Sequence, residues 1–298
     1  MTRQTVGVLG LGIMGTAISR NLIEAGFRVV GYDVLPERVR ELEAAGGEGA
    51  RSPGALAEAG AGIIVALLPS LAALEAVTGG RHGLLQAPRV GTILAECSTL
   101  PLAGKEDARA ALANVGITVL DCPLSGTGAQ AVTRDLAVYA SGERAAFERC
   151  RPVFAGFARS SHYTGPFGNG TRMKLVANLL VSIHNAAAAE AFVLGMKAGL
   201  TPEMIYEVVG AGAGTSRMFE VRGPMMVEAR YEEATMKIDV WQKDVQIITD
   251  FAREVGCPTP LFAAAAQLYT AALAQGRAKQ DTASVCAVLE EMARLARP

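Results

Sequence analysis

The stretch VGVLGLGIMG, residues 6–15, decides the fold of this chain. An apolar run of strand length leads into glycines spaced G-x-G-x-x-G, and a helical pattern begins at once. In such a strand–turn–helix unit the first glycine makes a tight turn and the second lets the backbone approach a pyrophosphate. The third lets the helix pack close to the strand, and the helix N-terminus attracts phosphates. The predicted dinucleotide contacts here are Gly10, Gly12, Ile13, Met14 and Gly15.

A carboxylate stands at the end of the second predicted strand. RVVGYD (28–33) has strand character, and Asp33 lies 18 residues after Gly15. A carboxylate at this position can accept hydrogen bonds from both ribose hydroxyls of a dinucleotide. It also repels a 2′-phosphate, and the nearest following arginine is Arg38, so NAD is favoured over NADP. The alternative is that Asp33 only begins the turn before Pro36.

Strand and helix signals continue to alternate beyond Asp33. PERVRELEAAG (36–46) is charged and amphipathic, and apolar runs of strand length follow at 62–69, 91–98 and 117–125. Strands that alternate with helices predict a parallel sheet covered by helices on both faces.

The second half of the chain has a different character. It begins after a stretch rich in glycine, proline and asparagine, TGPFGNGT (164–171). Helical patterns then follow at 171–198, 202–210, 235–255, 259–275 and 281–296. We therefore predict an α/β Rossmann domain at residues 1–162, which binds NAD, and an all-α domain at residues 163–298.

Composition and charge exclude several classes of protein. Half of the 298 residues are hydrophobic, which supplies two cores and argues against disorder. The 28 basic and 29 acidic residues are spread along the chain, so neither a nucleic acid nor a membrane surface is expected as a partner. The three histidines form no metal-site spacing, and no metal is expected. Five scattered cysteines and the absence of a signal-peptide pattern favour a soluble, cytoplasmic protein.

A lysine stands inside an apolar helical stretch, GTRMKLVANLL (170–180). Lys174 and Asn178 are four residues apart, about 40° around a helix, so they share a face. One interpretation is a polar seam that faces solvent or another helix. The other is a site, because SGTG (125–128) ends the last apolar run with a hydroxyl and a turn rich in N–H groups, suited to a carboxylate. Ligands bind open α/β sheets at the carboxyl ends of their strands.

Taken together, these motifs resemble those of the β-hydroxyacid dehydrogenases. That family includes 3-hydroxyisobutyrate dehydrogenase and tartronate semialdehyde reductase and is related to 6-phosphogluconate dehydrogenase. The resemblance covers nearly the whole chain. It rests on VGVLGLGIMG (6–15), LLPS (67–70), ECST (96–99), DCPLSGTGAQA (121–131), GNGTRMKLVAN (168–178) and WQKDVQI (241–247).

The resemblance implies roles for individual residues on the substrate side. Lys174 would be the general acid/base on the substrate hydroxyl, and Asn178 would orient the substrate. Ser125 and the backbone amides of Gly126 and Thr127 would hold the substrate carboxylate. The family's usual Ser-Gly-Gly is Ser-Gly-Thr here, so the carboxylate cradle or the substrate's shape is expected to differ.

Further residues are implied on the cofactor side. Leu68, Pro69 and Thr99 would line the nicotinamide half, while Lys243, paired with Asp244, would close on cofactor and substrate.

Two arginines in a segment that reads as a loop are open to two interpretations, contact with a second charge of the substrate or solvated surface. They are Arg217 and Arg222.

The implied reaction is reversible, NAD(P)-dependent oxidation of the CH–OH group of a small 3-hydroxy or polyhydroxy carboxylate, such as 3-hydroxyisobutyrate, glycerate or threonate. One alternative is reduction of a semialdehyde, tartronate or succinic, by the same chemistry in reverse. A non-catalytic NAD-binding module would explain the glycines and Asp33 but not the retained Lys174, Asn178, Ser125 and Lys243. The resemblance also implies a homodimer or homotetramer, with the long helix at 171–198 in its interface.

Overall fold

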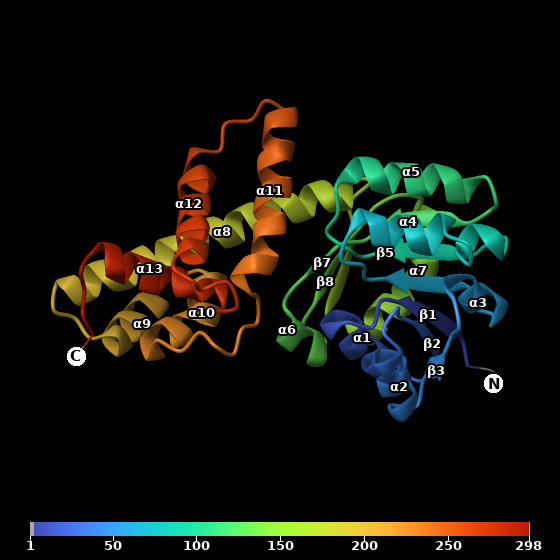
Figure 1. Ribbon diagram of the computed structural model, residues 1–298, viewed down its shortest axis with the longest axis horizontal. Coiled ribbons are helices and arrows are strands. Elements are labelled where there is room, and N and C mark those ends of the chain that lie inside the picture. Colours follow the sequence, from blue (N-terminus) through green and yellow to red (C-terminus); the bar gives the residue numbers. More distant parts are fainter. Residues whose placement is uncertain (1–2, 298) are drawn as a thin grey trace. The chain divides into compact units, whose positions relative to one another are not determined.

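The computed structural model describes residues 3–297 (Figure 1). The chain divides after Lys174 into two compact units, an α/β unit and a helical unit. The sequence-based boundary after residue 162 falls inside a strand, β9 (Ser160–Tyr163). The α/β unit therefore also contains the first turn of the long helix α8 (Asn169–Lys197).

A parallel six-stranded sheet forms the centre of the α/β unit, with the strand order β3-β2-β1-β4-β5-β6. This is the order of a dinucleotide-binding Rossmann sheet, and it confirms the predicted fold class. The direction of winding reverses between β1 and β4, and open α/β sheets bind ligands at such a point, outside the carboxyl ends of the strands. The strands are β1 (Thr5–Leu9), β2 (Arg28–Tyr32), β3 (Glu48–Gly49), β4 (Ile63–Ala66), β5 (Ile93–Glu96) and β6 (Thr118–Asp121).

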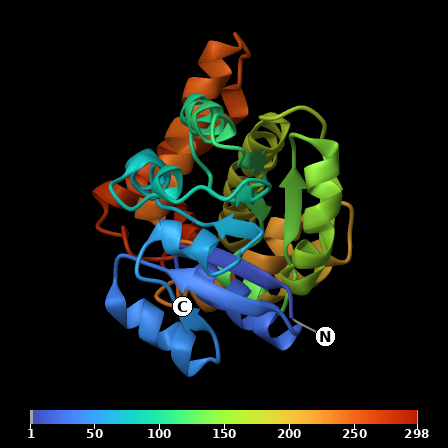
Figure 2. The ribbon, with the colours of Figure 1, turned by 90° about the vertical axis from the view of Figure 1, so that its right-hand side faces the viewer.

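Both faces of this sheet are buried, because successive side chains of each strand point to opposite sides. Val8 and Val65 belong to one core cluster, with side chains of α1 and α7, whereas Leu9 and Ile64 belong to another, with side chains of α3, α4 and α5. Figure 2 shows helices of this unit on both sides of the strands. The helices are α1 (Ile13–Glu24), α2 (Pro36–Ala44), α3 (Pro53–Glu58), α4 (Leu71–Gly79), α5 (Leu102–Ala113), α6 (Gly128–Val132) and α7 (Arg144–Phe157), with a 3-10 turn at Leu84–Gln86.

A second, three-stranded sheet follows β6 and was not predicted from the sequence. It has the order β7-β8-β9, in which β7 (Leu124–Ser125) runs antiparallel to β8 (Ala137–Ala140) and β8 runs parallel to β9. An isolated bridge between Asp121 and Ser141 connects this sheet to the end of β6.

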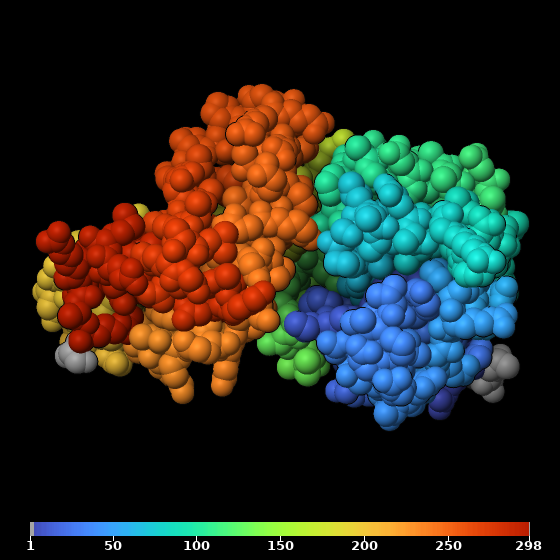
Figure 3. All heavy atoms as spheres, in the orientation of Figure 1, coloured from blue at the N-terminus to red at the C-terminus, as the bar shows by residue number. Residues whose placement is uncertain are grey.

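The helical unit is built on α8 and contains no strand among the described residues. Its apolar cluster draws on α8 to α13, and α11 packs beside α12 (Figures 1 and 3). The remaining helices are α9 (Pro202–Gly210), α10 (Arg217–Glu228), α11 (Ile238–Glu254), α12 (Pro260–Ala274) and α13 (Val285–Met292). One sequence expectation was wrong here, because the segment read as a loop is α10. The helix expected at 281–296 is present but shorter, as α13 preceded by a 3-10 turn (Thr282–Ser284).

Within residues 3–297, α8 is the one helix that is long and apolar enough to cross a membrane, with a mean hydropathy of 1.5. The core helix of a water-soluble domain meets the same criterion, and 44% of the apolar window is buried. Its polar side chains have partners in the helical unit. Asn185 donates to Tyr269 Oη (3.1 Å) and to the carbonyl oxygen of Thr282 (2.9 Å), which is typical of a core helix.

Candidate active site

The glycine-rich turn after β1 is shaped by the protein's own packing at two of its three glycines. Gly10 has a φ of +86°, and a Cβ atom there would lie 2.2 Å from the carbonyl oxygen of Leu67. A Cβ atom at Gly15 would lie 1.9 Å from the carbonyl oxygen of Gly10. Both positions therefore require glycine for the turn and for the packing of α1 against it.

Gly12 is different, because nothing in the protein requires a glycine there. Its φ is −68°, which any residue adopts, and a Cβ atom would meet no protein atom within 4 Å. Gly12 is also the N-cap of α1, and it brings no side chain to cap the helix. An open space at a helix N-terminus fits a pyrophosphate, whose close approach to the backbone explains the glycine.

Replacing Gly12 with alanine should raise the Kd for NAD roughly tenfold or more, because the Cβ atom would occupy the pyrophosphate's space. The free energy of unfolding should stay within about 0.5 kcal/mol of wild type, since the φ is ordinary and the site is open. Calorimetric titration with NAD and thermal unfolding measure the two quantities. Gly62→Ala is a matched control, because its Cβ atom also meets no atom within 4 Å but lies outside the turn. Unchanged NAD affinity in Gly12→Ala would contradict the assignment of the turn.

Asp33 is fixed against the glycine-rich turn. Its Oδ2 atom accepts the N–H of Leu11 at 2.7 Å, and its Oδ1 atom accepts the N–H of Leu35 at 2.9 Å. Each carboxylate oxygen keeps acceptor capacity for a ribose hydroxyl. Arg38 forms an ion pair with Glu41 at 3.2 Å. Asp33 is therefore a fixed negative charge, and Arg38 is already paired with a carboxylate. Both features favour a ribose without a 2′-phosphate.

The segments predicted to line the nicotinamide half follow β4 and β5 at the same edge of the sheet. The backbone N–H of Leu68 donates to the Ser98 hydroxyl at 2.7 Å, and the N–H of Ser98 donates to Glu96 Oε1 at 3.0 Å. Thr99 is the next residue and is half-buried. The predicted residues Leu68, Pro69 and Thr99 thus belong to two loops that are tied together.

The predicted carboxylate cradle begins at Ser125, the last residue of β7, and part of it is already engaged. Gly126 has a φ of +135°, and a Cβ atom there would lie 2.5 Å from Leu136 Cδ2, so glycine is required. The N–H of Thr127 donates to the side-chain oxygen of Gln130 at 3.0 Å, in a capping box at the start of α6. Gln130 in turn donates to Asp135 at 3.0 Å. Sequence reasoning missed Gln130, although T-x-x-Q is a recognised capping signal.

Lys174 and Asn178 lie one turn apart on α8, as the spacing predicted, and both are buried; Lys174 is only 8% exposed. Asn178 Nδ2 donates to Asp244 Oδ2 at 2.9 Å, and Lys243 Nζ lies 3.6 Å from Asp244 Oδ1. The helical unit therefore brings together three of the predicted residues, Asn178, Lys243 and Asp244, across α8 and α11.

The two arginines considered for a second substrate charge lie in α10. Arg222 is only 3% exposed, and its Nη1 atom is 3.6 Å from Asp281 Oδ1 in the core of the helical unit. The interpretation of Arg222 as a substrate contact or a solvated residue was wrong, because the segment is a helix and this side chain points inward. Arg217 is exposed and pairs with Glu220 at 3.0 Å.

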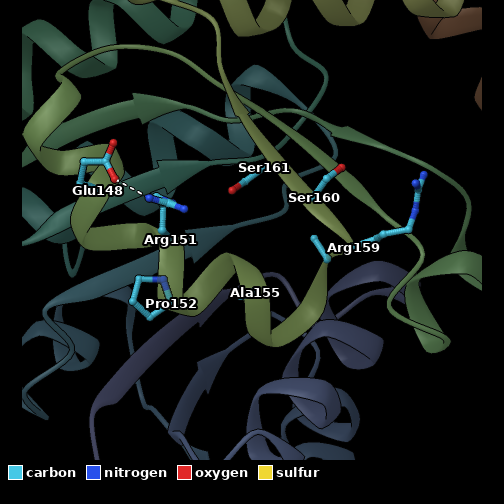
Figure 4. Close-up of a pocket in the computed structure, with 8 residues that line it drawn as sticks. Glu148, Arg151, Pro152, Ala155, Arg159, Ser160 and Ser161 are labelled. Atoms are coloured by element: carbon cyan, nitrogen blue, oxygen red, sulfur yellow. Dashed lines mark hydrogen bonds and ion pairs between the residues drawn. The ribbon is translucent and has the colours of Figure 1, made fainter.

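A surface hollow of about 440 Å³ is lined by residues of α7 and β9 and by the segment between them, and none of the predicted site residues lines it (Figure 4). Its arginines already have carboxylate partners. Arg151 pairs with Glu148 at 3.0 Å, and Arg159 pairs with Asp135 at 2.8 Å. The hollow is a groove between paired surface charges, and the candidate site is the carboxyl edge of the sheet.

Fold and site together define a dinucleotide-binding α/β unit that ends at Lys174, followed by a helical unit that carries Asn178. Comparison with known proteins agrees. A family model described as the NAD binding domain of 6-phosphogluconate dehydrogenase matches residues 5–165. A second, described as NAD-binding of NADP-dependent 3-hydroxyisobutyrate dehydrogenase, matches residues 168–289.

Individual relatives match along nearly the whole chain. An L-threonate dehydrogenase from Cupriavidus necator is 33% identical over 283 residues, which is 95% of each chain. A 2-(hydroxymethyl)glutarate dehydrogenase from Eubacterium barkeri is 31% identical and matches 96% of this chain and 95% of its own. The crystal structure of 3-hydroxyisobutyrate dehydrogenase from Salmonella typhimurium has a TM-score of 0.85 and 31% identity, and the match covers 95% of this chain and 99% of that chain.

The chain therefore belongs to the β-hydroxyacid dehydrogenase family, which confirms the resemblance carried by its motifs. It is an NAD-dependent oxidoreductase that acts on the CH–OH group of hydroxy acids.

Proposed function

We propose that the enzyme oxidises a small 3-hydroxy or polyhydroxy carboxylate, with Lys174 as the general base. The observation that carries this proposal is a lysine that is 8% exposed on a helix whose first turn is bonded to the carboxyl end of β6. Buried lysines are rare without a functional or charged partner. The dinucleotide motifs of β1 and β2 open at the same edge of the sheet.

The proposed chemistry assigns one task to each side chain. The neutral amine of Lys174 accepts the hydroxyl proton as the carbinol carbon becomes a carbonyl. Bound NAD supplies the acceptor for the hydride that leaves this carbon. Asn178, held by Asp244, orients the substrate, and Lys243 closes over the bound ligands. In the reverse direction Lys174 returns the proton, which is the chemistry of a semialdehyde reductase.

The carboxylate of the substrate is proposed to bind Ser125 and the amides of Gly126 and Thr127. The N–H of Thr127 donates to the side-chain carboxamide of Gln130 in the free enzyme. A carboxylate is a stronger hydrogen-bond acceptor than a carboxamide, so the substrate carboxylate can take the place of Gln130 as the acceptor. The difference from the family's usual Ser-Gly-Gly at this point favours a substrate other than 3-hydroxyisobutyrate. Among the relatives described above, the 33% identity to an L-threonate dehydrogenase makes threonate the first candidate.

An activity panel tests this function. The enzyme is mixed with NAD or NADP and with threonate, glycerate or 3-hydroxyisobutyrate, and NADH or NADPH formation is followed by absorbance. In the reverse direction, the enzyme is mixed with NADH and with tartronate or succinic semialdehyde, and the loss of NADH absorbance is followed. We expect turnover with NAD and at least one polyhydroxy acid, and weaker turnover with NADP. NAD binding without turnover on any of these compounds would instead favour the non-catalytic NAD-binding module.

Freeing the Thr127 amide should strengthen substrate binding. Gln130→Ala removes a competitor for that N–H, and a net hydrogen bond of about 1 kcal/mol predicts a KM for the hydroxy acid roughly fivefold lower. The KM for NAD should not change. Gln275→Ala, on a surface glutamine at the end of α12, is the matched control. A KM that stays constant or rises in Gln130→Ala would show that the substrate does not use the Thr127 amide.

We further propose a cytoplasmic homodimer or homotetramer, without a membrane or nucleic-acid partner. Exposed apolar side chains recur along one face of α8 at Met173, Val176 and Leu180, with helical spacing, and would be covered by a second copy. The five cysteines are free thiols, as is typical of a reducing compartment. The α/β unit would bind NAD, and the helical unit would serve substrate binding and assembly.

A further inference from the structure

A cation lies at the centre of the α/β unit with no exposed surface. Lys105, from α5, is 0% exposed, and its Nζ atom lies 2.6 Å from Glu96 Oε2 and 2.8 Å from Asp121 Oδ1. The same atom donates to the carbonyl oxygen of Ser98 at 2.7 Å. Burial alone would lower the pKa of Lys105, but Glu96 and Asp121 outweigh it and raise the pKa above its ordinary value. Lys105, Glu96 and Asp121 together form an ion triad.

The ion triad holds the first turn of α8. Asp121 Oδ2 accepts the N–H of Thr171 at 2.7 Å, and Asp121 Oδ1 accepts its hydroxyl at 2.7 Å. The Ser141 hydroxyl donates to Asp121 Oδ2 at 3.1 Å and accepts the N–H of Gly170 at 3.0 Å. A carboxylate near the N-terminus of a helix also interacts favourably with its dipole.

Packing at Gly170 shows how closely this turn lies on the strands. A Cβ atom there would be 2.3 Å from the carbonyl oxygen of Tyr139 and 2.6 Å from that of Asp121. The turn therefore cannot shift toward the strands, and its two hydrogen bonds from Thr171 keep it from lifting away. Lys174 follows Thr171 by three residues, one turn along the same helix.

Stability alone is a weak reason for such a triad. Desolvating three charges costs about as much as their mutual attraction returns, and apolar replacements of buried ion pairs are often neutral or stabilising. Lys105 has no predicted contact with cofactor or substrate. Its partners, however, are the last residues of β5 and β6, and the segments that follow these strands contain Thr99 and the carboxylate cradle.

We propose that the ion triad is a positioning device for the reaction, which sets the place of Lys174 through Thr171. Lys105, Glu96, Asp121 and Thr171 are positioning residues and touch neither substrate nor cofactor. The inference rests on the proposed role of Lys174 as the general base. Misplacing a reacting group by about 1 Å can cost about 10²-fold in rate, so loosening this turn should act on kcat.

Thr171→Val tests the coupling without disturbing the three charges. Valine keeps the shape of the side chain and the backbone N–H, but it removes the hydrogen bond from the hydroxyl to Asp121. We expect kcat for threonate to fall about tenfold or more. The KM for NAD should stay within about twofold of wild type. Thr171→Ser restores the hydroxyl and should restore kcat. The primary isotope effect with threonate deuterated at its carbinol carbons should rise in Thr171→Val, because the chemical step slows. A variant that is merely less folded would keep the wild-type isotope effect.

A second measurement needs no activity. Hydrogen exchange of residues 169–178 should be faster in Thr171→Val and in Lys105→Met than in wild type. Thr78→Val is the matched control, because this buried threonine bonds only carbonyl oxygens of its own helix, α4. Wild-type exchange in Thr171→Val, or faster exchange with an unchanged kcat, would overturn the proposal. Full activity of Lys174→Ala would instead overturn the proposed function, so the two failures are distinct.

Discussion

Replacing Lys174 with alanine is expected to lower kcat by about 10²–10⁴, the range that a general acid/base contributes. The side chain is buried on the face of α8 that also carries Asn178, which is held by Asp244 at 2.9 Å. Without the amine, the hydroxyl proton has no acceptor in place when hydride leaves the carbinol carbon. Steady-state NADH formation measures the loss. The Kd for NAD should stay near wild type, because Lys174 is not among the predicted dinucleotide contacts.

Two further variants make this result specific. Lys174→Arg keeps a positive charge but cannot give up its proton in the physiological range, so it should lose nearly as much kcat as Lys174→Ala. Lys197→Ala changes an exposed lysine in the last turn of the same helix and should leave kcat unchanged. Turnover of Lys174→Ala within about threefold of wild type would contradict the mechanism.

Local signals in the sequence were sufficient for the Rossmann fold. The glycine spacing at 10–15, the carboxylate that ends β2, and apolar runs that alternate with amphipathic stretches each depend on neighbouring residues. The structure shortens the expected strands, because the last residues of runs such as 62–69 form loops beyond the carboxyl end of β4 (Ile63–Ala66). Those loop residues include Leu68 and Pro69, which belong to the candidate site.

Elements that depend on distant packing could not be predicted. β7 has two residues, and β8 and β9 have four each, too few to show a clear alternation. α10 contains Gly223 and Pro224, which normally interrupt helices. A Cβ atom at Gly223 would lie 2.5 Å from the ring of Tyr206, so close packing against α9 explains the glycine. That reason is visible only in three dimensions.

The same limit applies to the polar core. Lys105 stands in GKEDARAALA (104–113), a sequence that is typical of a solvated helix face. Its carboxylate partners come from two other segments, so local periodicity gives no sign of burial. Lys174 was conspicuous because its neighbours are apolar. A buried charge among other charges is inconspicuous, and here Lys105 pairs with Asp121, the residue that accepts both hydrogen bonds from Thr171 in the first turn of α8.

The helical unit depends on another buried charge, Asp281. Its Oδ2 atom accepts the N–H groups of Thr235 and Met236 at 2.8 and 3.0 Å, and its Oδ1 atom accepts the N–H of Ala283 at 2.9 Å. Arg222, from α10, lies 3.6 Å away. This carboxylate therefore joins α10, the segment before α11 and the 3-10 turn before α13. Because α11 carries Lys243 and Asp244, the site depends on it indirectly.

Asp281→Asn should destabilise the helical unit by about 3–5 kcal/mol, because the buried Arg222 loses its counter-charge. The single tryptophan, Trp241, is buried in α11 and reports on this unit, so its fluorescence in a urea titration measures the change. Asp239→Asn is the matched control, an ion pair with Lys279 at the start of the same helix. Lys279 is largely exposed and Asp239 is half-buried, so the loss of this pair should cost less than about 1 kcal/mol.

The destabilisation should depend on pH in a defined direction. Burial alone would raise the pKa of the Asp281 carboxyl, but the Arg222 guanidinium and the N–H groups of Ala283 and Met236 outweigh it, so the pKa is lowered. A carboxyl of this kind stabilises the fold above its unfolded pKa, about 4, and loses that contribution as the pH falls through its folded pKa. The difference in unfolding free energy between wild type and Asp281→Asn should therefore be full at neutral pH and shrink below about pH 4. A difference that stays constant down to about pH 2 would show that the ionised carboxylate is not what holds these three segments together.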